Sequence, residues 1–357
     1  MKQTSLEKVF KGKSILVTGG TGSIGSELVR RLLKYEPSVI RVFSNDENAQ
    51  FQLEQELKDH SGCLRFLVGD VRDKERFKRA TENIDLVFHA AALKHVPLCE
   101  YNPFEAIKTN VIGTQNLLEV AITENVEKVV TISTDKAANP ANVMGATKLL
   151  AERLTIAANY YKGLKRTVFS CVRFGNVMAS RGSVIQTFEK QIRNGGPVTL
   201  TDPQMVRFWM SMDKAVDLVL KTAQMTKGEE IFIFKMPALH IKDLAEVMIE
   251  KLAPKYGYKP KDIEIRLIGK RKGEKLYEEL MTEEEAFNAY ETEDMLLVLP
   301  QNPQTVPNPR NGFKKVPLRR YTSRDTTILT KKQIRELLDS VLWSRAETLT
   351  LNATFAD

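Results

Sequence analysis

Cysteine and histidine are scarce in this chain, and their spacing argues against a disulfide framework and a metal site. Three cysteines and four histidines occur among 357 residues. The cysteines are Cys63, Cys99 and Cys171, which lie far apart and form no CxxC pair. Such spacing is typical of a protein kept in a reducing compartment. The histidines do not have the spacing of zinc ligands, so we expect no bound metal.

Long apolar segments are also absent. No apolar run approaches 18 residues, so we expect no membrane-spanning helix. The first residues, MKQTSLEKVFKGK, lack the apolar segment of a secretory signal. Hydrophobic residues make up 42% of the chain and charged residues 27%, as in globular domains. We therefore expect a cytoplasmic protein with no membrane partner.

Acidic residues are fewer than basic ones, and the formal net charge is +8. A positive charge favours either nucleic acid or an anionic small molecule as the partner. No DNA- or RNA-binding motif is present, and the most basic stretch, 310–335, mixes its charges with Pro, Gly and aromatic residues. We therefore expect an anionic small molecule and no nucleic acid. A nucleic-acid-associated protein would instead bind DNA with a steep salt dependence.

Short apolar runs alternate with helical patterns through the first 175 residues. The expected strands cover 14–18, 39–43, 65–68, 86–89, 128–133 and 168–173. The expected helices cover 23–33, 48–57, a long stretch from Pro103, and 142–160. Such alternation predicts a parallel sheet with helices on both faces, the doubly wound α/β fold of the Rossmann type. The residues that carry chemistry then gather at the carboxyl ends of the strands.

The alternation loosens after residue 176, which predicts a second, smaller domain. We expect the dinucleotide-binding domain to comprise residues 1–177 and about 205–237, because a helix at 212–226 and a strand at 230–234 can return to the sheet. The substrate-binding domain, a mixed α/β unit, would comprise about 178–204 and 238–357. The last expected helix spans 331–342.

Glycines follow the first expected strand in the pattern GxxGxxG, at Gly19, Gly22 and Gly25. Glycine lets the backbone turn tightly and approach a pyrophosphate, and the N-terminus of the next helix offers unpaired N–H groups. The strand before the loop and the helix after it favour a dinucleotide site over a structural glycine turn. The other residues assigned to this loop are Thr21, Ser23 and Ile24.

The second strand ends in Ser44, Asn45 and Asp46, where the adenosine ribose of a dinucleotide is usually bound. An acid there binds the 2′-hydroxyl of NAD, whereas a nearby arginine favours the 2′-phosphate of NADP. Ser44 and Asn45 can donate hydrogen bonds to a phosphate, and Asp46 can bind a ribose hydroxyl or face solvent. We expect NADP, with NAD as the alternative. The further positions expected along the dinucleotide are Asp70 and Val71 at the adenine edge and the small residues Ala90 and Ala92.

The segment from Thr134 to Lys148, TDKAANPANVMGATK, has the form of a catalytic segment. Asp135 and Lys136 follow a strand, and their opposite charges favour shifted pKa values and acid–base chemistry. Met144 and Lys148 are four residues apart, so they share one helix face. The alternative is that Asp135 and Lys136 form an exposed turn pair.

Five motifs stand out along the chain: TGGTGSIG, AALKHVPLCEYNP, STDKAANPANVMGATK, RFGNVMASRGSVI and TDPQMVRFWM. Together they resemble the extended short-chain dehydrogenase/reductases over essentially the whole chain. The narrower resemblance is to the nucleotide-sugar dehydratases and epimerases of surface-polysaccharide biosynthesis, above all the C5-inverting UDP-N-acetylglucosamine 4,6-dehydratases. Met144 stands where most of the superfamily has tyrosine, a replacement found in this branch. Asn45 stands where relatives often have arginine.

The resemblance implies roles for further residues. Lys148 would bind the nicotinamide ribose, Asn110 would shape the active-site helix, and Phe174 would lie along the cofactor. Lys94 could reach either the nicotinamide or the sugar. The residues expected to bind the UDP-sugar are Lys94, Asn176, Arg181, Val184, Arg207, Arg271 and Glu274. The segment 321–334 resembles an element that packs near neighbouring subunits, which implies a homo-oligomer, from dimer to hexamer.

A 4,6-dehydratase oxidises C4, eliminates the C5 proton and the 6-hydroxyl, and returns the stored hydride to C6. We hypothesise that Lys136 is the base at C5 and Asp135 the acid for the leaving hydroxyl, and that Thr134 forms a hydrogen bond with the 4-oxygen. Met144 has no titratable proton, so we expect it to pack beside the sugar or the nicotinamide. The C4-hydroxyl proton would leave through Asp135, Lys136 or a water.

Two other functions stay open. A C4-epimerase of the same family would return the hydride to C4 from the other face and leave C6 unchanged. A non-catalytic NADP-binding sensor would need no Asp135–Lys136 pair. The expected product, a UDP-4-keto-6-deoxy-hexosamine for polysaccharide synthesis, separates these possibilities, while the stereochemistry at C5 is left open by the sequence.

Overall fold

The computed structural model describes residues 5–178, 180–300 and 313–339. The chain divides into two compact units. Unit 1 comprises residues 1–174, 213–235 and 279–321, and unit 2 comprises residues 175–212, 236–278 and 322–357.

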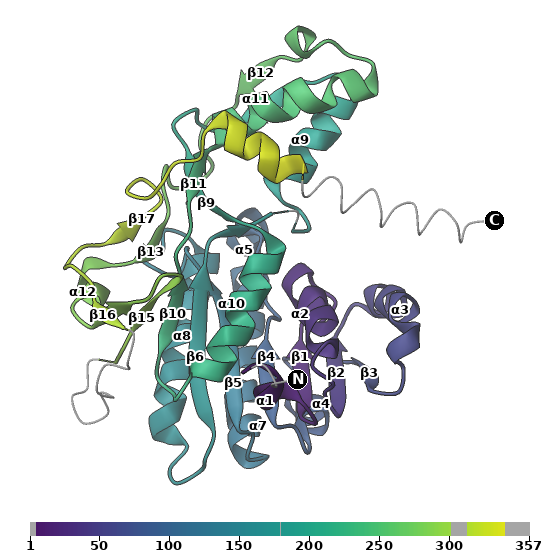
Figure 1. Ribbon diagram of the computed structural model, residues 1–357, viewed down its shortest axis with the longest axis vertical. Coiled ribbons are helices and arrows are strands. Elements are labelled where there is room, and N and C mark those ends of the chain that lie inside the picture. Colours follow the sequence, from purple (N-terminus) through teal and green to yellow (C-terminus); the bar gives the residue numbers. More distant parts are fainter. Residues whose placement is uncertain (1–4, 179, 301–312, 340–357) are drawn as a thin grey trace. The chain divides into compact units, whose positions relative to one another are not determined.

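Unit 1 is built on one large sheet flanked by helices (Figure 1). Its strands are β1 (Ser14–Thr18), β2 (Val39–Ser44), β3 (Leu64–Val68), β4 (Leu86–His89), β5 (Lys128–Thr134), β6 (Val168–Phe174), β10 (Ile231–Phe234), β14 (Ala289–Glu291), β15 (Met295–Val298) and β16 (Lys314–Lys315). Two short strands outside this sheet, β13 (Glu279–Met281) and β17 (Tyr321–Thr322), pair with each other.

The helices of unit 1 follow the strands in alternation through β6. They are α1 (Glu7–Phe10), α2 (Ser23–Leu33), α3 (Glu47–Glu56), η1 (Lys58–His60), α4 (Lys74–Thr81), α5 (Val96–Tyr101), α6 (Pro103–Ile107), η2 (Lys108–Ile112), α7 (Gly113–Thr123), α8 (Val143–Tyr161), α10 (Met212–Met225) and α12 (Glu283–Ala286). The long helix expected from Pro103 is interrupted, because η2 is a turn of π-helix between α6 and α7.

The strand order of the large sheet is β16-β14-β15-β10-β6-β5-β4-β1-β2-β3. The strands from β3 to β10 are parallel, while β15, β14 and β16 add an antiparallel edge. Strand β1 pairs with β2 on one side and with β4 on the other, so the winding reverses there. Such a reversal opens a crevice at the carboxyl ends of the strands. The expected doubly wound Rossmann-type sheet is confirmed.

Two helical layers bury the faces of this sheet (Figure 1). On one face, α2 and α10 are tied together by Arg31, which bonds to Asp213 at 2.6 Å and to Asp217 at 2.5 Å. On the other face, α4, α7 and α8 pack with the strands in one apolar cluster that includes Phe43, Phe77, Leu117, Val129 and Phe169. Because both faces are covered, the strands are continuous apolar runs.

Unit 2 is smaller and mixed. Its elements are β7 (Asn176–Val177), α9 (Val184–Arg193), β8 (Val198–Leu200), β9 (Val206–Met210), β11 (Ala238–His240), α11 (Ile241–Leu252), η3 (Pro254–Tyr256), η4 (Pro260–Asp262), β12 (Ile265–Leu267) and a helix over residues 331–339. Strands β11, β9 and β7 form one sheet, and β12 pairs with β8. An apolar cluster joins α9, α11 and the last helix, including Phe188, Leu244 and Leu338.

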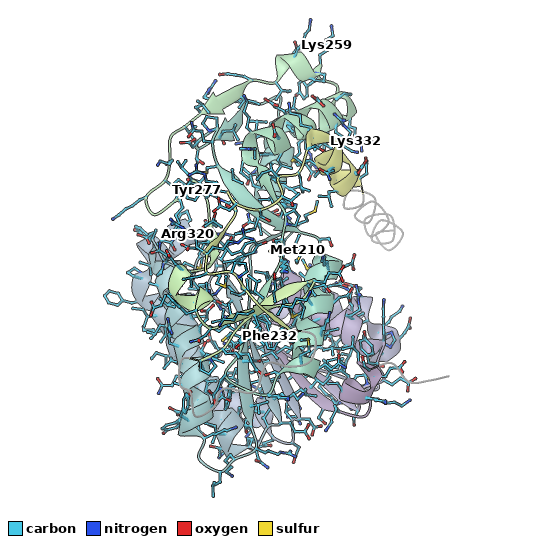
Figure 2. The ribbon with its side chains drawn as sticks, turned by 60° about the vertical axis from the view of Figure 1, so that its left-hand side comes forward. Met210, Phe232, Lys259, Tyr277, Arg320 and Lys332 are labelled. Atoms are coloured by element: carbon cyan, nitrogen blue, oxygen red, sulfur yellow. The ribbon has the colours of Figure 1, made fainter. Side chains whose placement is uncertain are left out.

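The expected domain boundaries differ from these units in three main places. Residues 175–177, which include β7, group with unit 2 because β7 pairs with β9. Residues 206–210 group with unit 2, because β9 pairs with β11 and β7 and ends at Met210, labelled in Figure 2. Residues 279–321 group with unit 1, because β15 pairs antiparallel with β10, the strand that carries Phe232. The chain thus returns to the large sheet twice, first with β10 and then with β14 and β15. The sequence did not predict the second return, since β14 and β15 are short and follow no helix of ordinary length.

Candidate active site

The glycine loop between β1 and α2 packs against the segment that follows β4. Gly19 has φ +60°, and a Cβ there would lie 2.7 Å from the backbone nitrogen of Ala91. A Cβ on Gly25 would overlap the carbonyl oxygen of Gly19. Helix α2 then begins at Ser23 without a side-chain cap. The loop therefore leaves backbone N–H groups at a helix N-terminus, which suits a phosphate group.

The end of β2 is largely occupied by contacts within the protein. The Ser44 hydroxyl is buried and lies 2.8 Å from Thr21 Oγ1, so both expected cofactor residues bond to each other. The Asp46 carboxylate caps α3 by accepting from Ala49 N–H at 3.0 Å. Of the three expected side chains, Asn45 alone reaches outward without capping a helix, and it bonds to Asp70.

Asp70 is held by Arg72. Arg72 donates to the two Asp70 carboxylate oxygens at 2.6 and 3.0 Å, and these bonds hold the pKa of Asp70 below its ordinary value. The next residue, Val71, is buried in the core with Phe43 and Phe77. Asp70 is thus a charged, partly exposed acceptor at the end of β3.

Behind the glycine loop, a buried histidine joins three elements. His89 Nδ1 lies 2.7 Å from Thr18 Oγ1, and Nε2 lies 3.2 Å from Thr114 Oγ1. Because Thr114 donates its proton to Asn110 O, the Nε2 nitrogen must carry the histidine proton and Nδ1 accepts from Thr18. Burial lowers the pKa of His89 to about 3. The histidine is therefore neutral and structural, a role that the sequence did not reveal.

Asn110 binds backbone rather than pointing outward. Its side chain accepts from Leu93 N–H at 2.8 Å and donates to Leu93 O and to Thr147 Oγ1 at 3.0 Å each. Asn110 lies in the π-turn, is 1% exposed, and links the segment after β4 to helix α8. The expected role of Asn110 in shaping the active-site helix stays a prediction. In the segment that it holds, Lys94 is exposed and Ala90 and Ala92 are half-buried.

The end of β5 carries a buried carboxylate paired with a lysine. Asp135 is 0% exposed, and its Oδ1 accepts from Lys136 Nζ at 2.9 Å and from Thr134 Oγ1 at 2.9 Å. Its backbone N–H donates to Phe174 O on the neighbouring strand at 3.1 Å. The alternative of an exposed turn pair is therefore wrong for Asp135, while Lys136 keeps about a fifth of its side chain exposed.

Helix α8 brings Lys148 back to the same strand. Lys148 Nζ donates to Ile132 O at 2.6 Å, and burial lowers the pKa of this lysine. The hydroxyl of Ser133 is buried and makes no hydrogen bond within the described residues. A buried hydroxyl without a partner beside a buried lysine is what a polar ligand would complete.

Met144 lies in an apolar cluster with Cys99 and Ala106. Helix α8 begins one residue earlier, where Glu100 accepts from Val143 N–H at 2.7 Å. Sequence reasoning missed Glu100 and also Gly145, whose Cβ would overlap Lys136 O. The helix that carries Met144 and Lys148 therefore rests directly on the Asp135–Lys136 loop.

A buried ion-pair network lies behind the site. Arg173 is fully buried and bonds to Glu152 at 2.6 Å and to Glu285 at 2.9 Å. Glu152 lies four residues after Lys148 on α8 and opposes the lowering of the lysine's pKa. This network was also missed, because Glu285 is more than a hundred residues from its partner.

The expected substrate residues of unit 2 fall into two groups. Arg207 is 6% exposed and donates to the carbonyl oxygens of Lys275 and Leu276 at 2.8 and 3.0 Å, with Glu274 3.8 Å away. Arg181 and Arg271 are exposed, and Asn176 and Val184 are half-buried. Beside them, Arg324 lies over the ring of Tyr277, labelled in Figure 2. The buried Arg207 organises this loop, while Arg181 and Arg271 lie at the surface.

The parallel sheet, the glycine loop at its switch point and the lysine-bearing helix α8 define an extended short-chain dehydrogenase/reductase. A family model described as "Polysaccharide biosynthesis protein" matches residues 15–300, so the chain belongs to that family. The similarities described next support the class of nucleotide-sugar dehydratases and epimerases for this chain.

Three curated relatives are similar to this chain over most of its length. A protein of Methanocaldococcus jannaschii described as an uncharacterized membrane protein is 61% identical over 94% of this chain and 98% of its own length. The inverting UDP-N-acetylglucosamine 4,6-dehydratase of Campylobacter jejuni is 44% identical over 82% of this chain and 84% of the enzyme. The UDP-glucose 4-epimerase of Rickettsia rickettsii is 41% identical over 92% of this chain and 96% of the epimerase. Among the described residues of the present chain, no helix has both the length and the apolar character that a membrane span requires.

Two solved structures share the fold. Pen from Bacillus thuringiensis is 45% identical with a TM-score of 0.87, covering 93% of this chain and 98% of that one. The dTDP-glucose 4,6-dehydratase of Streptomyces venezuelae, solved with NAD bound, is 26% identical with a TM-score of 0.66. The match covers 74% of this chain and 86% of the dehydratase.

Proposed function

We propose that the protein is a UDP-N-acetylglucosamine 4,6-dehydratase. The proposal rests on one observation, a buried aspartate paired with a lysine at the end of β5. The 44% identity to an inverting enzyme of that activity supports the same substrate. An acid and a base side by side are what an elimination needs, whereas epimerisation at C4 needs neither a base at C5 nor an acid at O6.

The cofactor proposed is NADP, with NAD as the alternative. The residues fit a dinucleotide. Gly19 and Gly25 let the loop pack where a Cβ would overlap backbone atoms, the start of α2 has no side-chain cap, and the buried Ser133 hydroxyl lacks a partner among the described residues. Lys148 would hold the nicotinamide ribose. The nicotinamide, when bound, accepts a hydride from C4 and returns it to C6.

The protein's own groups can account for every proton. Thr134 bonds to the 4-oxygen and passes the C4-hydroxyl proton to Asp135, whose Oδ1 lies 2.9 Å from Thr134 Oγ1. Before the cycle Lys136 releases its ammonium proton to solvent, and in the neutral form it then removes the C5 proton that the new carbonyl acidifies. Asp135 then gives its proton to O6, which leaves as water. Lys136 returns a proton to C5 as the hydride reaches C6, so both side chains regain their starting states.

The test is the product formed from UDP-N-acetylglucosamine in deuterated water, followed by NMR. A dehydratase gives a UDP-4-keto-6-deoxy-hexosamine with deuterium at C5, and the coupling constants report whether C5 is inverted. We expect Lys136→Met to lower turnover about 10²–10⁴-fold while dinucleotide binding persists. Near wild-type turnover in this variant would overturn the assignment of Lys136.

A second candidate, a C4-epimerase, has specific support in the 41% identity to a UDP-glucose 4-epimerase. It predicts a C4 epimer with C6 unchanged and no deuterium at C5. A non-catalytic sensor predicts dinucleotide binding with no change in any sugar nucleotide.

We also propose a homo-oligomer. Helices α5 and α6 and the π-turn pack beside α8, and the described side chains on these elements include many large apolar ones that are exposed. They are Leu98, Tyr101, Phe104, Ile107, Ile112, Leu150, Tyr160 and Tyr161. An apolar surface of this kind is typical of a subunit interface.

A cytoplasmic location remains a prediction.

A further inference from the structure

An arginine at the end of β3 and an asparagine at the end of β2 meet at one carboxylate oxygen. Arg72 donates from its NH2 nitrogen to Asp70 Oδ2 at 2.6 Å, and Asn45 donates from Nδ2 to the same oxygen at 3.4 Å. Arg72 also donates from Nε to Oδ1 at 3.0 Å. The guanidinium and the Asn45 amide therefore converge on the same point at the edge of the sheet.

The end of β2 provides no positive charge of its own. Residues 44–50, SNDENAQ, contain no lysine or arginine and two acids. The Ser44 hydroxyl is bonded to Thr21, and the Asp46 carboxylate caps α3. Because strand β2 ends where the adenosine ribose binds in this fold, a 2′-phosphate there needs a cation from another element.

We propose that Arg72, at the end of β3, is the residue that admits the 2′-phosphate of NADP and so decides the choice between NADP and NAD. The inference rests on the proposed dinucleotide function. The guanidinium presents a planar fork that can bind a phosphate through two hydrogen bonds, and Asn45 supplies a neutral donor beside it.

Arg72 can exchange its contact with Glu105 for a contact with a phosphate. Its third contact is with Glu105 Oε2 at 2.7 Å, and Glu105 also binds Lys108 at 2.9 Å. The Arg72 side chain is 43% exposed and that of Glu105 is 45% exposed. Exposed ion pairs of this kind are weak, and Glu105 keeps Lys108 when Arg72 leaves. Asp70 keeps the remaining guanidinium contacts, so its charge stays compensated when a phosphate arrives.

The test is calorimetric titration of the full chain and its variants with NADP and with NAD. We expect Arg72→Gln to weaken NADP binding about tenfold or more and to change NAD binding less than twofold. Glu105→Gln should act in the opposite direction and strengthen NADP binding severalfold, because it removes a competitor for the guanidinium. The matched control is Lys74→Gln, which removes a positive charge two residues away that pairs with Glu119.

The outcomes separate the inference from the proposed function. Equal weakening of NADP and NAD in Arg72→Gln overturns the inference, as does a wild-type protein that binds NAD but not NADP. In both cases the dinucleotide function stands. A wild-type protein that binds neither dinucleotide overturns both.

Discussion

Asp135 is fully buried although it can carry a charge, and its Oδ1 is held by Lys136 and by Thr134. Burying a carboxylate is costly unless it is paired and hydrogen-bonded. Met144, by contrast, lies among Cys99 and Ala106 and contributes only apolar packing in the described structure. Met144 has no proton to transfer, so in the proposed mechanism the neighbouring polar residues carry every proton.

His89 provides a residue-scale prediction about pH and stability. Its pKa falls from 6.5 to about 3 on folding, because burial disfavours the charged ring. The unfolded chain therefore binds a proton more readily, and the stability contributed by neutral His89 is complete above about pH 6.5 and is lost as the pH falls toward 3. We expect His89→Gln to lower the free energy of unfolding at pH 7.5. Between pH 7.5 and 5, the free energy of unfolding of the variant should fall less than that of wild type, by on the order of a few kcal/mol.

Urea unfolding at several pH values measures this effect. The control is His60→Gln, which replaces an exposed histidine and should leave the decline unchanged. If wild type and His89→Gln lose the same stability between pH 7.5 and 5, the buried ring is not the source of the pH dependence.

At the scale of elements, helix α8 is placed by its first turn. The Asn142 side chain accepts from Gly145 N–H at 2.8 Å, and Glu100 on α5 accepts from Val143 N–H at 2.7 Å. Caps of this kind contribute about 1 kcal/mol each. Because α8 carries Lys148 and rests on Lys136, its start sets the geometry of the site.

Gly145 gives the element-scale prediction. We expect Gly145→Ala to lower turnover at least about tenfold, because the added methyl group would overlap Lys136 O and move the loop that carries the base. Alanine normally favours a helix by up to about 1 kcal/mol, so a loss of stability here would be due to the overlap. Steady-state kinetics and thermal unfolding, measured together, report both effects.

The matched control is Gly62→Ala, since a Cβ at Gly62 would meet nothing within 4 Å. It should leave turnover within twofold of wild type. Unchanged turnover in Gly145→Ala would mean that the Lys136 loop can move without harm to the chemistry.

For the whole molecule, the apolar surface over α5, α6 and α8 leads to a prediction about assembly. We expect Tyr101→Lys with Phe104→Lys to shift the protein to a smaller species in light scattering after size exclusion, because both side chains are strongly exposed and would be covered in an oligomer. Leu267→Lys, on an exposed apolar residue of unit 2, is the control and should leave the mass unchanged. The same mass in all three proteins would exclude this surface as the interface.

The parallel order of β1 to β6 could be predicted, because each strand is a short apolar run followed by a helical pattern. The antiparallel edge of β14 and β15 could not, since its strands are three and four residues long and join the sheet at β10. In the site, Asp135 and Lys136 were proposed from their adjacent positions after a strand, and Lys148 was proposed from the family resemblance; their roles stay predictions. The contacts of His89, Arg173 and Glu100 were missed, because their partners are distant in sequence.

The sequence by itself determined the parallel architecture, the glycine loop and the residues at the strand ends, since local periodicity and the need for tight turns are properties of short segments. Only the tertiary structure decided which of those side chains are buried, paired or exposed. Asp46 caps a helix, Asp135 is fully buried, and Arg72 meets Asn45 at Asp70 because β2 and β3 pair in the sheet and end side by side.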